Sequence, residues 1–108
     1  MKKLIFLLAF FFSFHALATQ DIGKVKRIFV FKTTYGFMLE EGFGNAATEF
    51  NCSGKNGFAR IPKEGNPNST EMYSAILSAM AAGKTIRVNT EGCNGSHFTV
   101  SGIYVESS

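Results

Sequence analysis

The chain has 108 residues, a formal net charge of +3, 45% hydrophobic residues, 12 Phe, 2 Cys and no Trp. This length allows one domain, because domains usually contain roughly 100–200 residues. It excludes a (β/α)8-barrel enzyme, a dinucleotide-binding fold with an added substrate domain, and a repeat array of useful length.

The first 18 residues have the three-part pattern of a secretory signal peptide. Met1-Lys2-Lys3 is a short basic start, residues 4–14 are uncharged and almost wholly apolar, and Ala16-Leu17-Ala18 places small residues before a cleavage point. This apolar run is shorter than the about 20 residues that a membrane-spanning helix needs. We therefore expect cleavage after Ala18, a secreted or periplasmic protein, and no membrane span in the mature chain. An uncleaved anchoring helix is the alternative.

Cleavage changes the charge balance. Removing 18 of the 108 residues leaves a single domain of 90, residues 19–108, and the loss of Lys2 and Lys3 leaves 9 basic against 8 acidic side chains. Nucleic-acid binding depends on a clustered positive field, so a net charge of about +1 argues against a nucleic-acid partner. The basic residues between Lys24 and Lys32 are interpreted as a solvated strand face.

Cys52 and Cys93 are the only cysteines. A domain of this size has a marginal core, and export places both thiols in an oxidising compartment. We expect one disulfide between them, which closes a loop of 40 residues and contributes roughly 4 kcal/mol by loop-closure entropy. The alternative is a free or metal-binding thiol. The absence of a CxxC neighbour and the single His of the mature chain disfavour it.

The first half of the mature chain predicts four short strands. Apolar β-branched and aromatic residues indicate a strand over residues 24–32, which a turn joins to a partner strand over 37–40. A third strand is expected over 48–52 and a fourth over 58–61, ended by Pro62.

A helix is expected next, over Ser69–Ala82. Asn68 and Glu71 have the spacing of a capping box, and Gly83 suits the left-handed residue that follows a last helical turn. One apolar stripe of core-packing residues is predicted by Met72, Tyr73, Ile76, Leu77 and Met80, with Ala75, Ala79 and Ala82 beside it.

The chain then returns to strands. Residues 84–89 alternate between apolar and polar side chains, residues 90–96 read as a loop, and residues 97–105 form a last strand with Phe98, Val100 and Tyr104 on one face. Gly102 indicates a bulge or bend in that strand.

The expected order is therefore β-β-β-β-α-β-β, a mainly β chain with one α-helix. An open sheet would leave a face bare and could not bury the seven Phe that remain after cleavage. The simplest solution is a small antiparallel barrel of the oligonucleotide/oligosaccharide-binding (OB) type, with the helix over one end or side. An open antiparallel sheet with the helix across one face is the alternative.

The sequence offers little for catalysis. His97 is the only His of the mature chain, no GxSxG motif is present, and no zinc or calcium ligand spacing occurs. Glu40 and Glu41 could act as an acid/base pair on a glycoside, but adjacent strand residues point to opposite faces. We expect no enzyme activity, no cofactor and no metal site.

Binding residues are more plausible near two loops. Aromatic rings pack on the apolar faces of sugars, and amide, hydroxyl and imidazole groups fix the sugar hydroxyls. The candidate ligand-binding residues of this kind are Tyr35, Phe37, Phe43, Asn94, Ser96 and His97. The alternative is that Tyr35 and Phe43 only cover the rim of the barrel.

The segment STEMYSAILSAMAAGKTIRVNTEGC, followed by FTVSGIYV, resembles part of the B subunits of subtilase cytotoxin and typhoid toxin. It is also similar to a group of small secreted bacterial proteins that end in the same way. The shared pattern is a helix ending at Gly, a strand with Arg between β-branched residues, and a Cys-bearing loop, and it covers about Asn51 to Val105.

This resemblance implies an OB-type barrel, a disulfide, and a five-subunit ring that binds sialylated glycans. The chain is shorter than the toxin subunits, has fewer cysteines, and lacks at residues 19–24 the Ser of their sugar pocket. We take only the fold from the resemblance.

The leading functional hypothesis is an exported, non-enzymatic binding module, with a glycan as the candidate ligand. The alternative is a periplasmic inhibitor or accessory protein that docks a protein partner through an exposed strand or the loop at 64–68. A small glycan hydrolase that uses Glu40 or Glu41 is the third hypothesis.

Overall fold

The computed structural model describes residues 19–52 and 57–107. The expected signal peptide, residues 1–18, lies outside the described residues. The elements follow the order β1 (Thr19–Val30), β2 (Thr34–Leu39), α1 (Gly44–Glu49), β3 (Ala59–Pro62), α2 (Ser69–Ala82), β4 (Thr85–Asn94) and β5 (His97–Val105).

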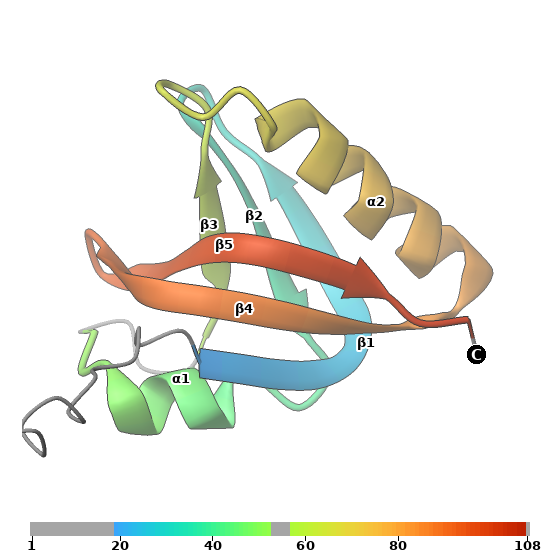
Figure 1. Ribbon diagram of the computed structural model, residues 1–108, viewed down its shortest axis with the longest axis horizontal. Helices are drawn as coiled ribbons and strands as arrows, with labels where there is room; N and C mark the ends of the chain where they lie inside the picture. The colour runs from blue at the N-terminus through green and yellow to red at the C-terminus, as the bar shows by residue number, and fades with distance from the viewer. Residues whose placement is uncertain (1–18, 53–56, 108) are drawn as a thin grey trace, which may run out of the picture.

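The five strands close into a ring in the order β1-β2-β3-β5-β4 (Figure 1). β1 completes the ring because its first half, up to Lys24, pairs with β4, and its second half, from Val25, pairs with β2. A register shift between Val25 and Arg27 marks this change of partner. The mainly β prediction is confirmed, and the closed ring favours the OB-like arrangement over an open sheet. One pair differs from the antiparallel expectation, since β3 and β5 run parallel.

The third predicted strand is wrong. Residues 48–52 do not form a strand, because the short helix α1 occupies residues 44–49. The Asp21 carboxylate of β1 accepts hydrogen bonds from the backbone N–H groups of Asn45 (2.8 Å) and Ala46 (3.0 Å). A carboxylate at the start of a helix accepts hydrogen bonds from N–H groups that have no partner within the helix. Its negative charge also interacts favourably with the positive end of the helix dipole. Residues 19–52 and 57–107 therefore contain five strands and two helices.

The last two strands form a longer hairpin than expected. β4 continues to Asn94, so the loop predicted at 90–96 shrinks to a turn at Gly95 and Ser96. The predicted irregularity near Gly102 is confirmed, because Asn89 pairs with Gly102 while Thr90 pairs with Val100. The extra residue reverses the alternation of side chains.

Because of this reversal, the prediction that Phe98, Val100 and Tyr104 share one face of β5 is wrong for Tyr104. Phe98 and Val100 are buried as predicted, but Tyr104 is 53% exposed and lies outside the ring.

The predicted helix over Ser69–Ala82 is confirmed at both ends. Gly83 adopts the left-handed conformation (φ 66°), and its N–H bonds to the carbonyl of Met80. The predicted capping box is wrong, since the side chain of Asn68 makes no capping hydrogen bond. Asn66 instead holds the backbone at the start of α2. Its carbonyl accepts a hydrogen bond from the N–H of Ser69 (3.1 Å), and its Oδ1 accepts one from the N–H of Asn68 (3.3 Å).

The apolar stripe of α2 is only partly buried. Ile76 and Ala79 lie in the core, whereas Leu77 and Met80 are exposed. The apolar stripe is therefore wider than the part of the helix that packs against the strands.

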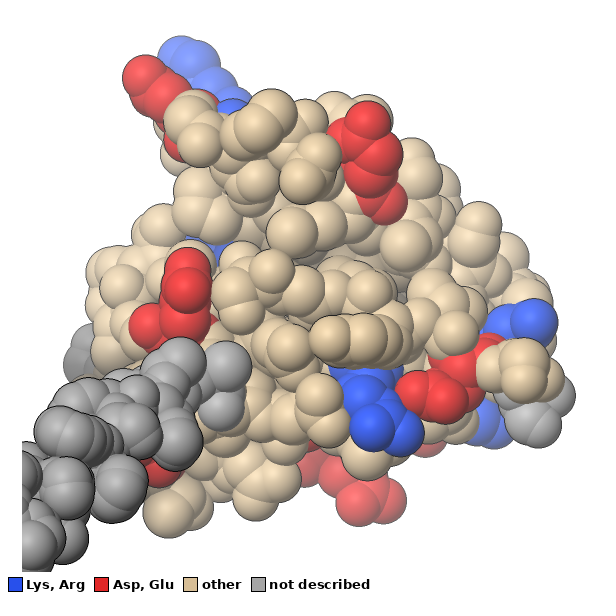
Figure 2. All heavy atoms as spheres, viewed as in Figure 1, with Lys and Arg blue, Asp and Glu red and all other residues tan. Residues whose placement is uncertain are grey.

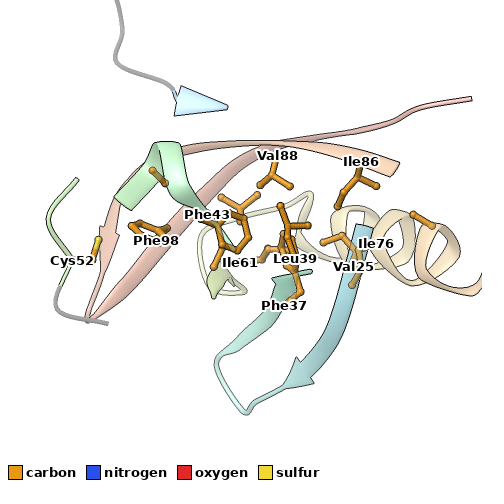
Figure 3. Close-up of a cluster of buried hydrophobic side chains, with 14 residues drawn as sticks. Val25, Phe37, Leu39, Phe43, Cys52, Ile61, Ile76, Ile86, Val88 and Phe98 are labelled. Atoms are coloured by element: carbon orange, nitrogen blue, oxygen red, sulfur yellow. The ribbon is translucent and has the colours of Figure 1, made fainter. Parts of the chain in front are cut away.

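The core fills the ring and continues under α2. Figure 3 shows Phe37, Leu39 and Ile61 at its centre, with Ile76 of α2 and Val25 toward one end and Phe98 and Cys52 toward the other. Burying such side chains contributes about 1.5–3 kcal/mol each.

The predicted disulfide is confirmed. Cys52 and Cys93 are bonded, with their Cα atoms 5.7 Å apart. The bond ties the segment after α1 to the end of β4, beside the β4–β5 turn.

Candidate functional site

A row of aromatic rings crosses the outside of the ring of strands. Phe31 stacks on Phe29 with centroids 5.8 Å apart, and Phe29 lies 4.8 Å from Phe58. Phe58 in turn stacks on His97 at 3.8 Å. We call this row, together with Arg60, the outer aromatic face.

The sheet register explains how these residues meet. Phe29 of β1 is opposite Gly36 of β2, and Gly36 is opposite Arg60 of β3. Residues directly opposite each other in paired strands point to the same side. Gly36 has no side chain, so the Phe58 ring can lie over the sheet at this point. Phe58 and His97 each immediately precede a residue of the parallel β3–β5 pair, which brings them side by side.

The rings of this face are accessible to solvent. Phe31 is 42% exposed, and Phe29, Phe58 and His97 are half-buried. Because these rings are only partly buried, they contribute less to the stability of the fold than fully buried rings would. The arrangement provides flat apolar platforms joined into one surface.

Arg60 gives this surface a positive charge. Its guanidinium carbon lies 5.8 Å from the centroid of the Phe58 ring. Within the described residues the ion pair present joins Arg87 to Glu106, so Arg60 has no acidic partner there. A guanidinium without a carboxylate partner is free to bind polar or anionic ligand groups.

Two nitrogen atoms at this face are buried and lack hydrogen-bond partners among the described residues: Nε of Arg60 and Nδ1 of His97. Burial, and secondarily the charge of Arg60, lowers the pKa of His97 below its ordinary value of 6.5. The lowered pKa favours the neutral imidazole, which has one ring nitrogen as donor and the other as acceptor.

The turn between β4 and β5 forms one border of the face. Asn94 pairs with His97 across the hairpin, and a Cβ placed on Gly95 would lie 3.5 Å from Nη1 of Arg60. The structure thus brings the predicted site residues Asn94 and His97 to the outer aromatic face, and Ser96 lies between them in the turn.

Tyr35 lies elsewhere. It is opposite the buried Ile61 rather than Arg60, and its ring stacks on Tyr73 of α2 at 4.3 Å. Nζ of Lys63 lies 4.5 Å from the Tyr35 ring and donates a hydrogen bond to the carbonyl of Phe31 (2.8 Å). Tyr35 therefore joins α2 to the sheet.

Phe37 and Phe43 are corrections to the predicted site. Their exposed fractions are 1% and 0%, and their rings meet edge to face in the core at 5.7 Å. Phe37 is two residues from Tyr35 on the same inward-facing side of β2, so proximity to the turn does not expose it.

The face also contains residues that were not among the predicted site residues: Phe29, Phe31, Phe58 and Arg60. A signal for them exists in the sequence, because Phe29 and Phe31, and likewise Phe58 and Arg60, are two residues apart. This spacing places both members of each pair on one side of an extended backbone.

Glu40 and Glu41 are both exposed at the end of β2, and Glu41 borders a shallow depression that also includes Asp21, Gly42 and Asn45. Within residues 19–52 and 57–107, no group of three or more His, Cys, Asp or Glu side chains is placed to hold a metal ion.

Comparison with models of known families, with curated proteins and with solved structures yields no match. In the part of the chain that the structure describes, no helix is long and apolar enough to cross a membrane.

Proposed function

We propose that this protein is an exported, non-enzymatic binding module whose outer aromatic face binds a glycan. The observation that carries the proposal is the continuous row Phe31–Phe29–Phe58–His97 on the solvent side of a closed ring of strands. The face lies over β1, β2, β3 and the start of β5. OB-type folds bind oligosaccharides and oligonucleotides with the β2–β3 face and the adjoining loops.

The chemistry of the face suits a sugar chain. Rings at this spacing offer successive apolar platforms, while the Arg60 guanidinium and His97 imidazole can bond hydroxyl or carboxylate groups. Asn94 and Ser96 in the bordering turn add amide and hydroxyl groups. A few polar groups converging on an apolar surface are typical of small-molecule sites.

Charge favours a glycan over a nucleic acid. The chain expected after export has 9 basic and 8 acidic side chains, which does not provide the clustered positive field that phosphate backbones require. The five-subunit ring implied by the toxin resemblance is a separate proposal. Native mass spectrometry tests it, and a monomer at micromolar concentration would contradict it.

A glycan array tests the main proposal. The processed wild-type protein, a Phe58→Ala variant and a Tyr104→Ala variant are compared on the same array. Tyr104 is the matched control, because it is an exposed aromatic residue toward the opposite end of β5.

We expect wild type and Tyr104→Ala to bind the same glycans and Phe58→Ala, which removes the central ring of the row, to lose at least about tenfold in affinity, or about 1.4 kcal/mol. Thermal melts of all three variants verify folding. A wild-type protein that binds no glycan, or equal loss in the two variants, would count against the proposal.

A further inference from the structure

One edge of β5 has no strand partner within the described residues. The parallel pairing with β3 covers only Phe98 and Thr99 of β5, whereas β5 runs on to Val105. Its other edge pairs with β4 from His97 to Val105, with two irregularities in register. From Val100 onward, β5 therefore has no neighbouring strand to bind the backbone N–H and C=O groups on this edge.

The sequence at the end of β3 explains why β3 and β5 separate after a short pairing. β3 ends at Pro62, which lacks a backbone N–H and turns the chain away. The carbonyl of Pro62 accepts a hydrogen bond from Nδ2 of Asn66 (3.0 Å), and the N–H of Lys63 bonds to the carbonyl of Thr33 (3.0 Å). These bonds fix the loop before α2 away from the β5 edge.

A depression of about 460 Å³ lies between this loop and β5. It is open to solvent, and its volume is in the range of about 300–1,000 Å³ that is usual for binding sites. Thr99, Val100 and Ser101 of β5 form one wall, and Glu64, Asn66 and Met72 are among the residues that form the other. The face that carries β5 and α2 is mostly uncharged, with separate acidic and basic side chains (Figure 2).

The charged residues that line the depression are both acidic, Glu64 and Glu91. Glu71 is exposed in the first turn of α2, next to the lining residue Met72. Arg87, a cation of β4, is already paired with Glu106 at 3.0 Å. The complement of this edge is therefore a positively charged strand.

We propose that the β5 edge at Val100 and Ser101, which borders the depression, docks an extended, basic peptide segment of a partner protein, which pairs with the sheet there as a further short strand. Backbone hydrogen bonds to β5 supply the affinity of such strand addition, and alternate side chains supply its specificity. Lys or Arg side chains of the peptide pair with Glu64 and Glu91, and its apolar side chains pack on Met72. This surface is separate from the outer aromatic face, and the inference does not depend on glycan binding.

An NMR titration tests the inference on the processed, disulfide-bonded protein. The probe is a short acetylated and amidated peptide that alternates Lys and Val. The same peptide with Glu in place of Lys tests the role of charge, and a version with N-methylated backbone nitrogens tests strand pairing.

We expect the Lys/Val peptide to shift the amide signals of Thr99 to Ser101, which line the depression, and to bind with a Kd of about 1 mM or lower. The N-methylated and Glu/Val peptides lose most of this response. A Glu64→Gln, Glu91→Gln double variant weakens binding about threefold to tenfold, because partly exposed ion pairs contribute modestly. A Glu40→Gln, Glu41→Gln variant is the matched control and binds as the wild type does.

Three results would overturn the inference: no response up to about 1 mM peptide, equal binding of the Lys/Val and Glu/Val peptides, or shifts confined to Phe29, Phe58 and His97. The last result would assign peptide binding to the outer aromatic face instead.

Discussion

Gly36 lies directly under the ring of Phe58. A Cβ on Gly36 would be 3.2 Å from both Cδ2 and Cε2 of Phe58, and 3.4 Å from the carbonyl oxygen of Ala59. Since Phe58 also stacks on His97, the missing side chain at Gly36 positions the centre of the outer aromatic face.

Gly36→Ala is therefore expected to displace the Phe58 ring and weaken ligand binding, at a cost in stability of about 1–3 kcal/mol from overpacking. Binding to an array-selected glycan and urea denaturation measure the two effects. Gly44→Ala is the matched control, because a Cβ there meets no atom within 4 Å. Unchanged glycan binding in Gly36→Ala would contradict the assigned role of the Phe58 ring.

The disulfide is expected to carry much of the stability of this small domain. Replacing Cys52 and Cys93 by Ser should lower the free energy of unfolding by about 2–5 kcal/mol, because the unfolded chain regains the freedom that the closed loop removes. Urea denaturation with and without reductant measures this loss. A wild-type midpoint that reductant does not change would contradict the prediction.

Asp21 is expected to hold α1 in place. The side chain is 6% exposed and accepts two backbone N–H groups of α1. Asp21→Ala should destabilise the protein by about 1.5–3 kcal/mol, because charge-assisted hydrogen bonds are lost and two N–H groups lose their partner. Glu49→Gln, at the exposed end of α1, is the control and should stay within about 0.5 kcal/mol of wild type. Equal stability of the two variants in urea denaturation would refute this role.

His97 is expected to make the protein less stable in mild acid. Burial and the Arg60 charge hold its folded-state pKa below 6.5, so the unfolded chain binds the proton more readily as the pH falls below that value. The contribution is fully present above pH 6.5 and is lost as the pH falls toward the folded pKa. In urea denaturation at pH 7.5 and 5, His97→Gln should lose less stability than wild type does. An identical loss would rule out this effect.

The sequence predicts α2 well and α1 not at all, for a physical reason. α2 is encoded locally, by its apolar spacing and by Gly83. The acceptor for the first N–H groups of α1 is Asp21, which is 24 residues before Asn45 in the chain and appears only when β1 is in place. A β-like pattern at residues 48–52 was therefore misleading.

The candidate site was predicted in part. Asn94, Ser96 and His97 follow from the polar turn, but the partners of His97 come from β1 and β3. Their proximity depends on strand register, which local sequence does not fix. Phe37 was wrongly placed at the surface because closeness to a turn does not determine which side of a strand a residue faces.

The most direct test of the central claim is a 1H–15N NMR titration of the processed protein with the glycan that binds best on the array. We expect the largest shifts at Phe29, Gly36, Phe58, Arg60 and His97, with Ile22 and Tyr104 unchanged. Shifts centred on any other surface, or a spectrum that the glycan leaves unaltered, would contradict the claim that the outer aromatic face is the binding site.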